Sequence, residues 1–305
     1  MNDIKEVLNK YNYNPEKISI IGKVTVVETK DKKLVIKPNN KNVKDVFDYL
    51  KSKNFHNYLG YINEASDEFL MFPYINNITE EDGDKAKDLI SLVALLHSKT
   101  AFYKAVSVDE IKKIYEEKTE HLDYLDKYYD NLRFYIEEQQ FPSPSNYYLL
   151  RNISWIFHSI SSSKYFLDKW YDIVKDKKNK RVGLIHGNLE LNHLLESNEK
   201  VIISWDNAKN DLLIYDLIGL YKKNYNDTDF FNLFKLYESY FPLALEERYL
   251  LFSLMLEPDK LKLDDIEILN MKKCYYQIKY LQTSSSIISN YHSEKANNED
   301  NKEKK

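Results

Sequence analysis

The segment Leu184-Ile-His-Gly-Asn-Leu-Glu-Leu-Asn-His-Leu-Leu195 decides how the rest of the sequence is interpreted. It begins inside Val182-Gly-Leu-Ile185, a short apolar run that predicts a buried strand. A second apolar run, Val201-Ile-Ile203, leads into Ser204-Trp-Asp-Asn207, and Ile214-Tyr-Asp-Leu217 follows at the start of a helical stretch. Polar residues that could act in catalysis or binding therefore follow each of the two predicted buried strands. Asp216 comes shortly after the second of them.

The region before this segment divides into a strand-rich part and a helical part. An amphipathic pattern predicts a short helix over 1–13, and β-branched runs predict strands on both sides of Gly22 and after it. A helix then begins at Asn42, with Val43, Val46, Phe47 and Leu50 on its apolar face. The predicted order is β-β-β-α-β-β, with strands in 18–29 (two), 34–37, 58–64 and 68–74.

After residue 76 the periodicity is helical. Helices are predicted over 84–99, 108–140 and 146–174 and through most of 212–281. The basic run 176–181 is interpreted as a solvated loop. The sequence therefore predicts a strand-rich lobe over 1–75, a helical lobe over 76–290 that contains the segment 184–216, and a disordered charged tail over 291–305.

These segments resemble the aminoglycoside phosphotransferase and choline kinase branch of the protein-kinase-like fold. That family carries H-G-D-x-x-x-x-N in its catalytic loop, then I-D-W-[ED], then D-L at the start of the next helix. The strand Leu34–Lys37, the hinge-like run Phe69–Ile75 and the pair Leu96-His97 match it further upstream. The resemblance implies an α+β, two-lobed fold, with a small antiparallel sheet lobe that carries one helix and a larger, mainly helical lobe.

Three chemical positions of that family are altered in this sequence. The resemblance places Asn188 where the general-base aspartate stands, and an amide cannot accept a proton near neutral pH. It places His193 and Ser204 where an asparagine and an aspartate hold Mg²⁺, although hard Mg²⁺ prefers charged or carbonyl oxygen ligands. A shift of register would bring Asn192 or Asp206 to the metal instead.

The scaffold positions of the same loop are kept. The resemblance gives His186 and Asp216 the role of holding the loop backbone, and Gly187 is kept as part of that backbone. Loss of the chemical residues together with retention of the structural ones is the pattern expected of a pseudokinase.

The nucleotide-binding positions are only partly kept. Lys37 stands where a phosphate-positioning lysine belongs, with Asp45 or Asp48 as a shorter helix partner than the usual glutamate. Gly22 is the single glycine where a phosphate-covering loop would stand, and the resemblance assigns Met71 and Tyr74 to the nucleotide-binding hinge. The residues themselves establish no cofactor, and the resemblance implies ATP and Mg²⁺.

Composition excludes several other classes of protein. With only six glycines in 305 residues, neither a Rossmann fingerprint nor a Walker-type phosphate loop can be written. A net charge of −4 gives no broad basic field for nucleic acid, and no apolar run is long enough for a membrane span. Cys274 is the only cysteine, which fits a reducing, cytoplasmic compartment.

The leading hypothesis is a degenerate kinase-fold protein that acts by binding or scaffolding. The alternative is an active ATP-dependent small-molecule phosphotransferase with a rearranged metal site. Tyr240-Phe-Pro-Leu243, Glu246 and Pro258 resemble the spore-coat CotS/YutH-type subgroup, which implies a protein partner, such as a spore-coat protein, and a spore-coat location. A small-molecule ligand is also compatible with the resemblance.

Overall fold

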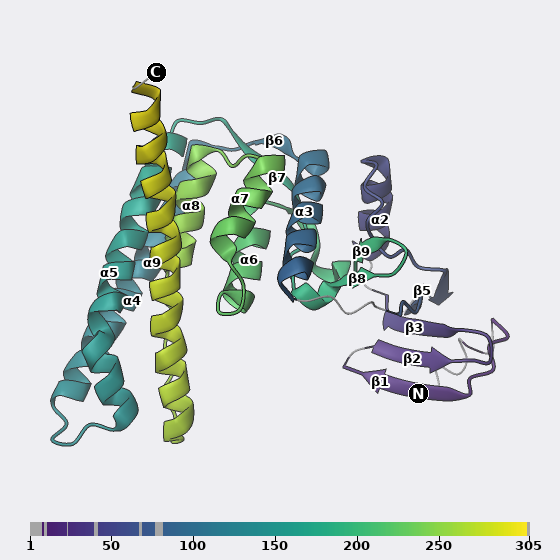
Figure 1. The fold of residues 1–305 in the computed structure, drawn as a ribbon, viewed down its shortest axis with the longest axis horizontal. Helices are drawn as coiled ribbons and strands as arrows, with labels where there is room; N and C mark the ends of the chain where they lie inside the picture. Colours follow the sequence, from purple (N-terminus) through teal and green to yellow (C-terminus); the bar gives the residue numbers. More distant parts are fainter. Residues whose placement is uncertain are drawn as a thin grey trace. The chain divides into compact units, whose positions relative to one another are not determined.

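The computed structural model describes residues 8, 11–22, 24–39, 42–66, 69–76 and 82–303 of the chain (Figure 1). Most of the helix predicted over 1–13 lies outside these residues. The chain forms two compact units, one made of 1–101 with 183–216 and the other of 102–182 with 217–305. The predicted lobe boundary at residue 75 separates strand-rich from helical sequence within the first unit, and it stays a prediction.

The first unit contains an antiparallel sheet of five strands in the order β1-β2-β3-β5-β4. Its interior is apolar because alternate residues of the β-branched strands point to one face, where Val27, Leu34, Ile36 and Met71 pack around Leu8. The strands are β1 (Lys17–Ile21), β2 (Val24–Glu28), β3 (Lys33–Pro38), β4 (Asn63–Ser66) and β5 (Phe69–Pro73), with α2 (Asn42–Ser52) between β3 and β4. The predicted β-β-β-α-β-β order is confirmed.

The rest of the first unit carries the segment that the sequence singled out. The helix α3 (Asp82–Thr100) buries Leu89, Val93 and Leu96. The strand β7 (Asn179–Ile185) enters this unit at residue 183 and pairs there with β10 (Lys209–Asp211), and β8 (Leu194–Glu196) pairs with β9 (Lys200–Ile202). Between these strands lie the short 3-10 turns η1 (Leu191–His193) and η2 (Trp205–Asn207).

The second unit is mainly helical. The helix α5 (Pro144–Val174) packs against α4 (Val108–Glu137), α8 (Leu245–Leu256) and α9 (Glu267–Glu303), which run beside it in Figure 1. Ser107 and Ser143 cap α4 and α5 by accepting backbone N–H groups of the first turn. The remaining elements are β6 (Phe102–Ala105), α6 (Ile214–Asn224, which begins in the first unit) and α7 (Phe230–Tyr240).

The far end of the chain is a continuation of α9. The described backbone is helical as far as Glu303, so the segment 291–303 is drawn as helix (Figure 1). The predicted disorder of 291–305 stays a prediction about this polar sequence in solution. Among the described helices, none is both long enough and apolar enough to span a membrane.

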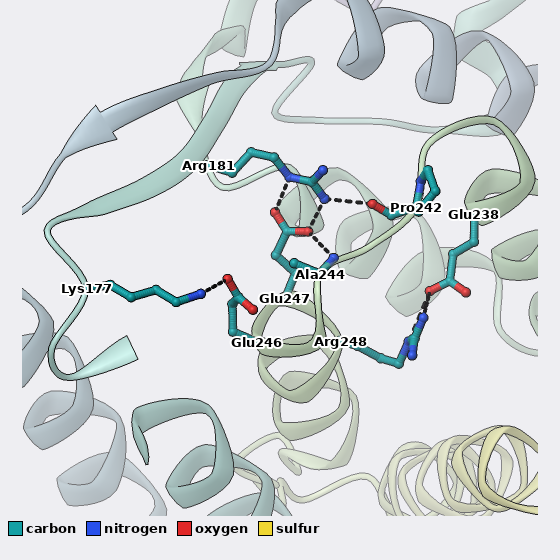
Figure 2. Close-up of polar contacts among 8 residues, drawn as sticks. All are labelled: Lys177, Arg181, Glu238, Pro242, Ala244, Glu246, Glu247 and Arg248. Atoms are coloured by element: carbon teal, nitrogen blue, oxygen red, sulfur yellow. Dashed lines mark hydrogen bonds and ion pairs between the residues drawn. The ribbon is translucent and has the colours of Figure 1, made fainter. Parts of the chain in front are cut away.

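The basic run 176–181 is a solvated loop only in part: residues 176–178 form a turn, whereas residues 179–181 belong to β7, so the expectation was wrong for the second half of the run. Arg181 lies in β7, and Figure 2 shows its guanidinium in a two-point contact with the carboxylate of Glu247, which is only 8% exposed. The same carboxylate accepts the N–H of Ala244 at 2.8 Å and so closes the first turn of α8. Arg181 also donates to the carbonyl oxygen of Pro242 at 2.8 Å and stacks on Phe241.

This contact is expected to stabilise the helical unit. Glu247→Ala leaves the half-buried guanidinium of Arg181 without its ion-pair partner and the N–H of Ala244 without its acceptor. We therefore expect a loss of about 3 kcal/mol in the free energy of unfolding. Urea denaturation measures this loss. Asp172→Ala, which breaks the exposed Lys175–Asp172 pair, is the control and should leave the urea midpoint close to that of the wild type. Equal midpoints for the two variants would contradict the assignment.

Candidate functional site

The carboxylate of Asp216 organises the site from a fully buried position. It accepts the backbone N–H of His186 at 2.7 Å and that of Gly187 at 2.9 Å, one on each oxygen. It also contacts Nε2 of His97 on α3 at 3.3 Å, where the imidazole is the donor because an ionised carboxylate can only accept. One side chain thus joins α6, α3 and the loop that follows β7.

The ionised form of Asp216 is favoured in this environment. Burial acts to raise its pKa, but the hydrogen bond from His97, the positive potential of the two histidines and the backbone N–H of His186 outweigh it. The pKa of Asp216 therefore lies below its ordinary value. The ionised carboxylate is thus suited to hold the two backbone N–H groups of the loop.

Gly187 is required by the close approach of two backbone segments. Its φ is +78°, a left-handed conformation that residues with a side chain rarely adopt. A Cβ there would lie 2.3 Å from the carbonyl oxygen of Asn207. The loop after β7 and the turn η2 can touch only because residue 187 has no side chain.

His186 joins the two polar segments. Its Nε2 lies 2.8 Å from the carbonyl oxygen of Ile203 and must be the donor, since a carbonyl only accepts. Ile203 in turn donates its N–H to the carbonyl oxygen of His193 at 2.9 Å. The ring of His186 packs edge-on to Trp205 and near the ring of His193. The backbone around residues 193 and 203 is therefore held in register with the loop at 186.

Ser204 has an unusual backbone conformation at the start of η2. Its φ of 69° and ψ of 49° are left-handed, which costs a residue with a Cβ about 1–2 kcal/mol. Trp205, next in the chain, is almost fully buried and anchors the turn by donating Nε1–H to the carbonyl oxygen of Ile202 at 2.9 Å. Because its neighbours are anchored, residue 204 is held in this strained conformation, as is common for strained residues at functional sites.

Lys37 and Ser204 meet in one cavity, although they are far apart in the sequence. The ammonium of Lys37 donates to the hydroxyl of Ser204 at 3.3 Å. The cavity is about 440 Å³ and lies within the first unit, where Tyr74 and Asp206 also line it. Burial lowers the pKa of Lys37, and the nearby negative charge of Asp206 partly opposes this. The cavity is thus lined by the ammonium of Lys37, the carboxylate of Asp206 and the hydroxyl of Ser204.

The other predicted site residues lie elsewhere. Met71 has a fully buried side chain in the sheet core, and Gly22 forms the left-handed turn between β1 and β2. Asn188, Asn192 and His193 lie on the loop and η1 that follow β7 rather than on the cavity wall described above. In the described part of the chain, no group of three or more His, Cys, Asp or Glu side chains is arranged to hold a metal ion.

Asp45 and Asp48 do not serve as the helix partner that the sequence suggested for Lys37. Both lie on exposed positions of α2, and the contacts of Lys37 within the described residues are with Ser204, the ring of Phe72 and the charge of Asp206. The lysine is therefore held by a hydroxyl rather than by a helix carboxylate.

The cavity also has apolar walls that sequence reasoning did not single out. They come from alternate positions of β3 and β5, from α2 and the segment that follows it, and from the segment after β9. The signal for them was the strand alternation, which puts Val35 on the same face as Lys37. These walls include Val35, Val43, Phe47, Leu59, Leu70, Phe72 and Ile203.

Comparison with known proteins bears on the fold. No family model matches this sequence, and no curated protein matches it. An aminoglycoside phosphotransferase from Alicyclobacillus acidocaldarius has a similar structure, with a TM-score of 0.70 at 10% identity over 95% of this chain and 96% of that chain. A spectinomycin phosphotransferase, solved as an AMP-bound complex, gives a TM-score of 0.55 at 14% identity over 95% and 94% of the two chains.

These similarities show the fold alone. The chain has the two-lobed α+β fold of aminoglycoside phosphotransferases, with an antiparallel sheet lobe and a larger helical lobe. The predicted fold class is confirmed.

The role of Asp216 predicts a defined pH dependence. Asp216→Asn presents one acceptor instead of two, so one backbone N–H of the loop loses its partner, and we expect a loss of about 2–3 kcal/mol near neutral pH. Because the folded-state pKa is lowered, the charged carboxylate contributes stability above the ordinary value of 3.8 and loses it as the pH falls through the lower folded pKa.

The difference in unfolding free energy between the wild type and Asp216→Asn should therefore stay constant from about pH 7 to 5 and shrink below about pH 4. Urea denaturation across this range measures it, with the exposed Asp227→Asn as the control for loss of one charge. A difference that does not vary with pH would contradict the role of the charged form.

The backbone of Ser204 predicts the order of two variants. Ser204→Ala and Ser204→Gly both remove the hydroxyl that contacts Lys37, but only glycine removes the strained Cβ. We therefore expect Ser204→Gly to be more stable than Ser204→Ala by about 1 kcal/mol, measured by urea denaturation. If the alanine variant were equally or more stable, the left-handed conformation would be wrong.

Proposed function

We propose that this protein is a pseudokinase, which binds a ligand in the Lys37–Ser204 cavity and does not transfer phosphate. The observation that carries the proposal is the contact between the Lys37 ammonium and the Ser204 hydroxyl. In phosphoryl transfer on this type of fold, an aspartate holds Mg²⁺ against the phosphates beside the lysine. A serine at that position offers Mg²⁺ no charge.

The loop that would supply the general base supports the same proposal. The clamp from Asp216 to His186 and Gly187 fixes the backbone just before residue 188. The residue held there is Asn188, whose amide cannot take a proton from a substrate hydroxyl. On this proposal, the loop backbone is held as a general base would require, and the residue at the position of the base is an amide.

The cavity itself still suits a ligand. Its volume of about 440 Å³, its apolar walls and its few polar groups have the composition of small-molecule sites. Lys37 and Asp206 supply one cation and one carboxylate at its polar end. A function by ligand binding or scaffolding uses these features without metal chemistry.

Asp206 favours a second candidate function, an active phosphotransferase with a rearranged metal site. Its carboxylate lines the same cavity as Lys37, and its charge acts on that ammonium. Were Asp206 to hold Mg²⁺ in place of residue 204, with ATP as the phosphate donor, one metal ligand would be restored. The general base would still be missing at residue 188.

The proposal of a spore-coat partner rests on the CotS/YutH-type resemblance alone. Several of the residues that carry it are used inside the helical unit. Phe241 stacks on Arg181. Pro242 accepts a hydrogen bond from Arg181, and Glu246 pairs with Lys177 (Figure 2). Their structural use explains the motif without a partner. A cytoplasmic location with recruitment to the coat is tested by a fluorescent fusion in a sporulating host, where a uniform vegetative signal would argue against recruitment.

Phosphoryl transfer from radiolabelled ATP tests the pseudokinase proposal. Purified protein with millimolar Mg²⁺ and a panel of amino alcohols and aminoglycosides should transfer label no faster than a reaction without protein. The reason is that neither a base at residue 188 nor a charged ligand at residue 204 is present.

Two matched variants make this result decisive. Asp206→Asn removes the carboxylate in the cavity, and Asp211→Asn removes one outside it, on β10. Transfer by the wild type that Asp211→Asn retains and Asp206→Asn loses would overturn the proposal and establish the rearranged metal site. Transfer that survives both Asp206→Asn and Lys37→Met does not arise in this cavity and leaves the proposal standing.

A further inference from the structure

A second cavity lies wholly within the second, mainly helical unit. It shares no lining residue with the Lys37–Ser204 cavity, which lies in the first unit. It measures about 410 Å³ and is bounded by the end of α6, the segment before α9 and one face of α9 itself. Its wall combines lysines with tyrosines, and the residues that matter here are Lys222, Tyr225, Lys262, Lys273, Tyr276 and Gln277.

Positive charge exceeds negative charge around this cavity. Four lysines line it, against the single carboxylate of Asp259. Lys273 is paired with Asp264 at 2.8 Å, and Lys260 is engaged by the hydroxyl and ring of Tyr124. Lys222 and Lys262, both exposed, have no ion-pair partner among the described residues.

The excess charge also acts on a neighbouring lysine. Burial is the main cause that lowers the pKa of Lys118 on α4, and the positive charge of Lys222 lowers it further, against the opposing effect of Glu257. An anion bound beside Lys222 would relieve this repulsion between like charges.

Gln277 supplies an independent observation that points to a ligand. Its side chain lines the cavity and is 6% exposed. The backbone N–H of Asp259 donates to Oε1 at 3.2 Å, which fixes the orientation of the amide, because that N–H needs an acceptor. Nε2 then has no hydrogen-bond partner among the described residues, so a buried donor remains to be satisfied.

We propose that this cavity binds a phosphate monoester with an apolar or aromatic body. Lysines act as point charges that suit a phosphate dianion, whereas a planar carboxylate is better matched by the arginine fork, which this cavity lacks in its described wall. Gln277 adds a buried polar side chain to the wall, and the rings of Tyr225 and Tyr276 provide walls for the body of the ligand. The volume is within the range of small-molecule sites.

Isothermal titration calorimetry of the full-length protein with phenyl phosphate tests this site. The double variant Lys222→Gln/Lys262→Gln should weaken binding by about tenfold or more, since two charge-assisted contacts are lost. The matched control Lys112→Gln/Lys113→Gln removes the same charge from exposed positions of α4 and should change the affinity less than about twofold. Gln277→Leu should weaken binding while the circular dichroism spectrum stays that of the wild type.

The remaining outcomes separate this site from the alternatives. Equal weakening in both lysine pairs would show a general charge effect and overturn the proposal, as would equal binding of neutral phenol. Loss of binding in Lys37→Met but not in Lys222→Gln/Lys262→Gln would place the ligand in the other cavity and overturn it. Absence of binding at 10 mM phenyl phosphate, well above ordinary affinities for such sites, would also overturn it. None of these results bears on phosphoryl transfer at Lys37 and Ser204.

Discussion

The buried carboxylate of Asp216 is the interaction on which the first unit depends. Its two oxygens accept the backbone N–H groups of His186 and Gly187, and one of these oxygens also accepts a hydrogen bond from Nε2 of His97. A buried charge is stable only when it is paired and hydrogen-bonded, and these partners meet that requirement. The loop after β7 is fixed by this clamp, and the fixed His186 in turn fixes Ile203, next to Ser204.

The structure separates two physical demands that an active kinase site combines. Holding the loop requires a buried carboxylate, a glycine at a crowded position and a donor histidine, and Asp216, Gly187 and His186 meet these demands. Transferring phosphate requires a base and charged metal ligands, and under the pseudokinase proposal Asn188 and Ser204 occupy those positions without supplying them. Because the first set stabilises the fold by itself, it can be retained when the second is lost.

Much of the fold could be predicted because its signals are local. β-branched runs gave the strands of the sheet, and apolar periodicity gave α2, α3, α4 and α5. The short strands β6, β8 and β10 were missed because three or four residues show no period, and every residue of β6 is exposed. Arg181 was misread because its partner Glu247 is 66 positions away, and sequence spacing contains no sign of such a contact.

The cavity at Lys37 could be anticipated only in part, for the same reason. Motif resemblance identified Lys37 and Ser204, but their contact depends on the left-handed turn at residue 204, and no sequence rule predicts that turn for a serine. The second cavity had no motif at all. Its lysines are scattered over α6, the segment between α8 and α9, and α9 itself, and only folding brings them beside Gln277.

Metal binding at the Lys37–Ser204 cavity tests the central claim most directly, because the claim is that the charged metal ligands are gone. Water proton relaxation reports whether Mn²⁺, used in place of Mg²⁺, becomes immobilised on the protein in the presence of ADP. We predict the relaxation rate of Mn²⁺–ADP to be unchanged by the wild-type protein and enhanced by the Ser204→Asp variant. Strong enhancement by the wild type, lost in Asp206→Asn, would contradict the account.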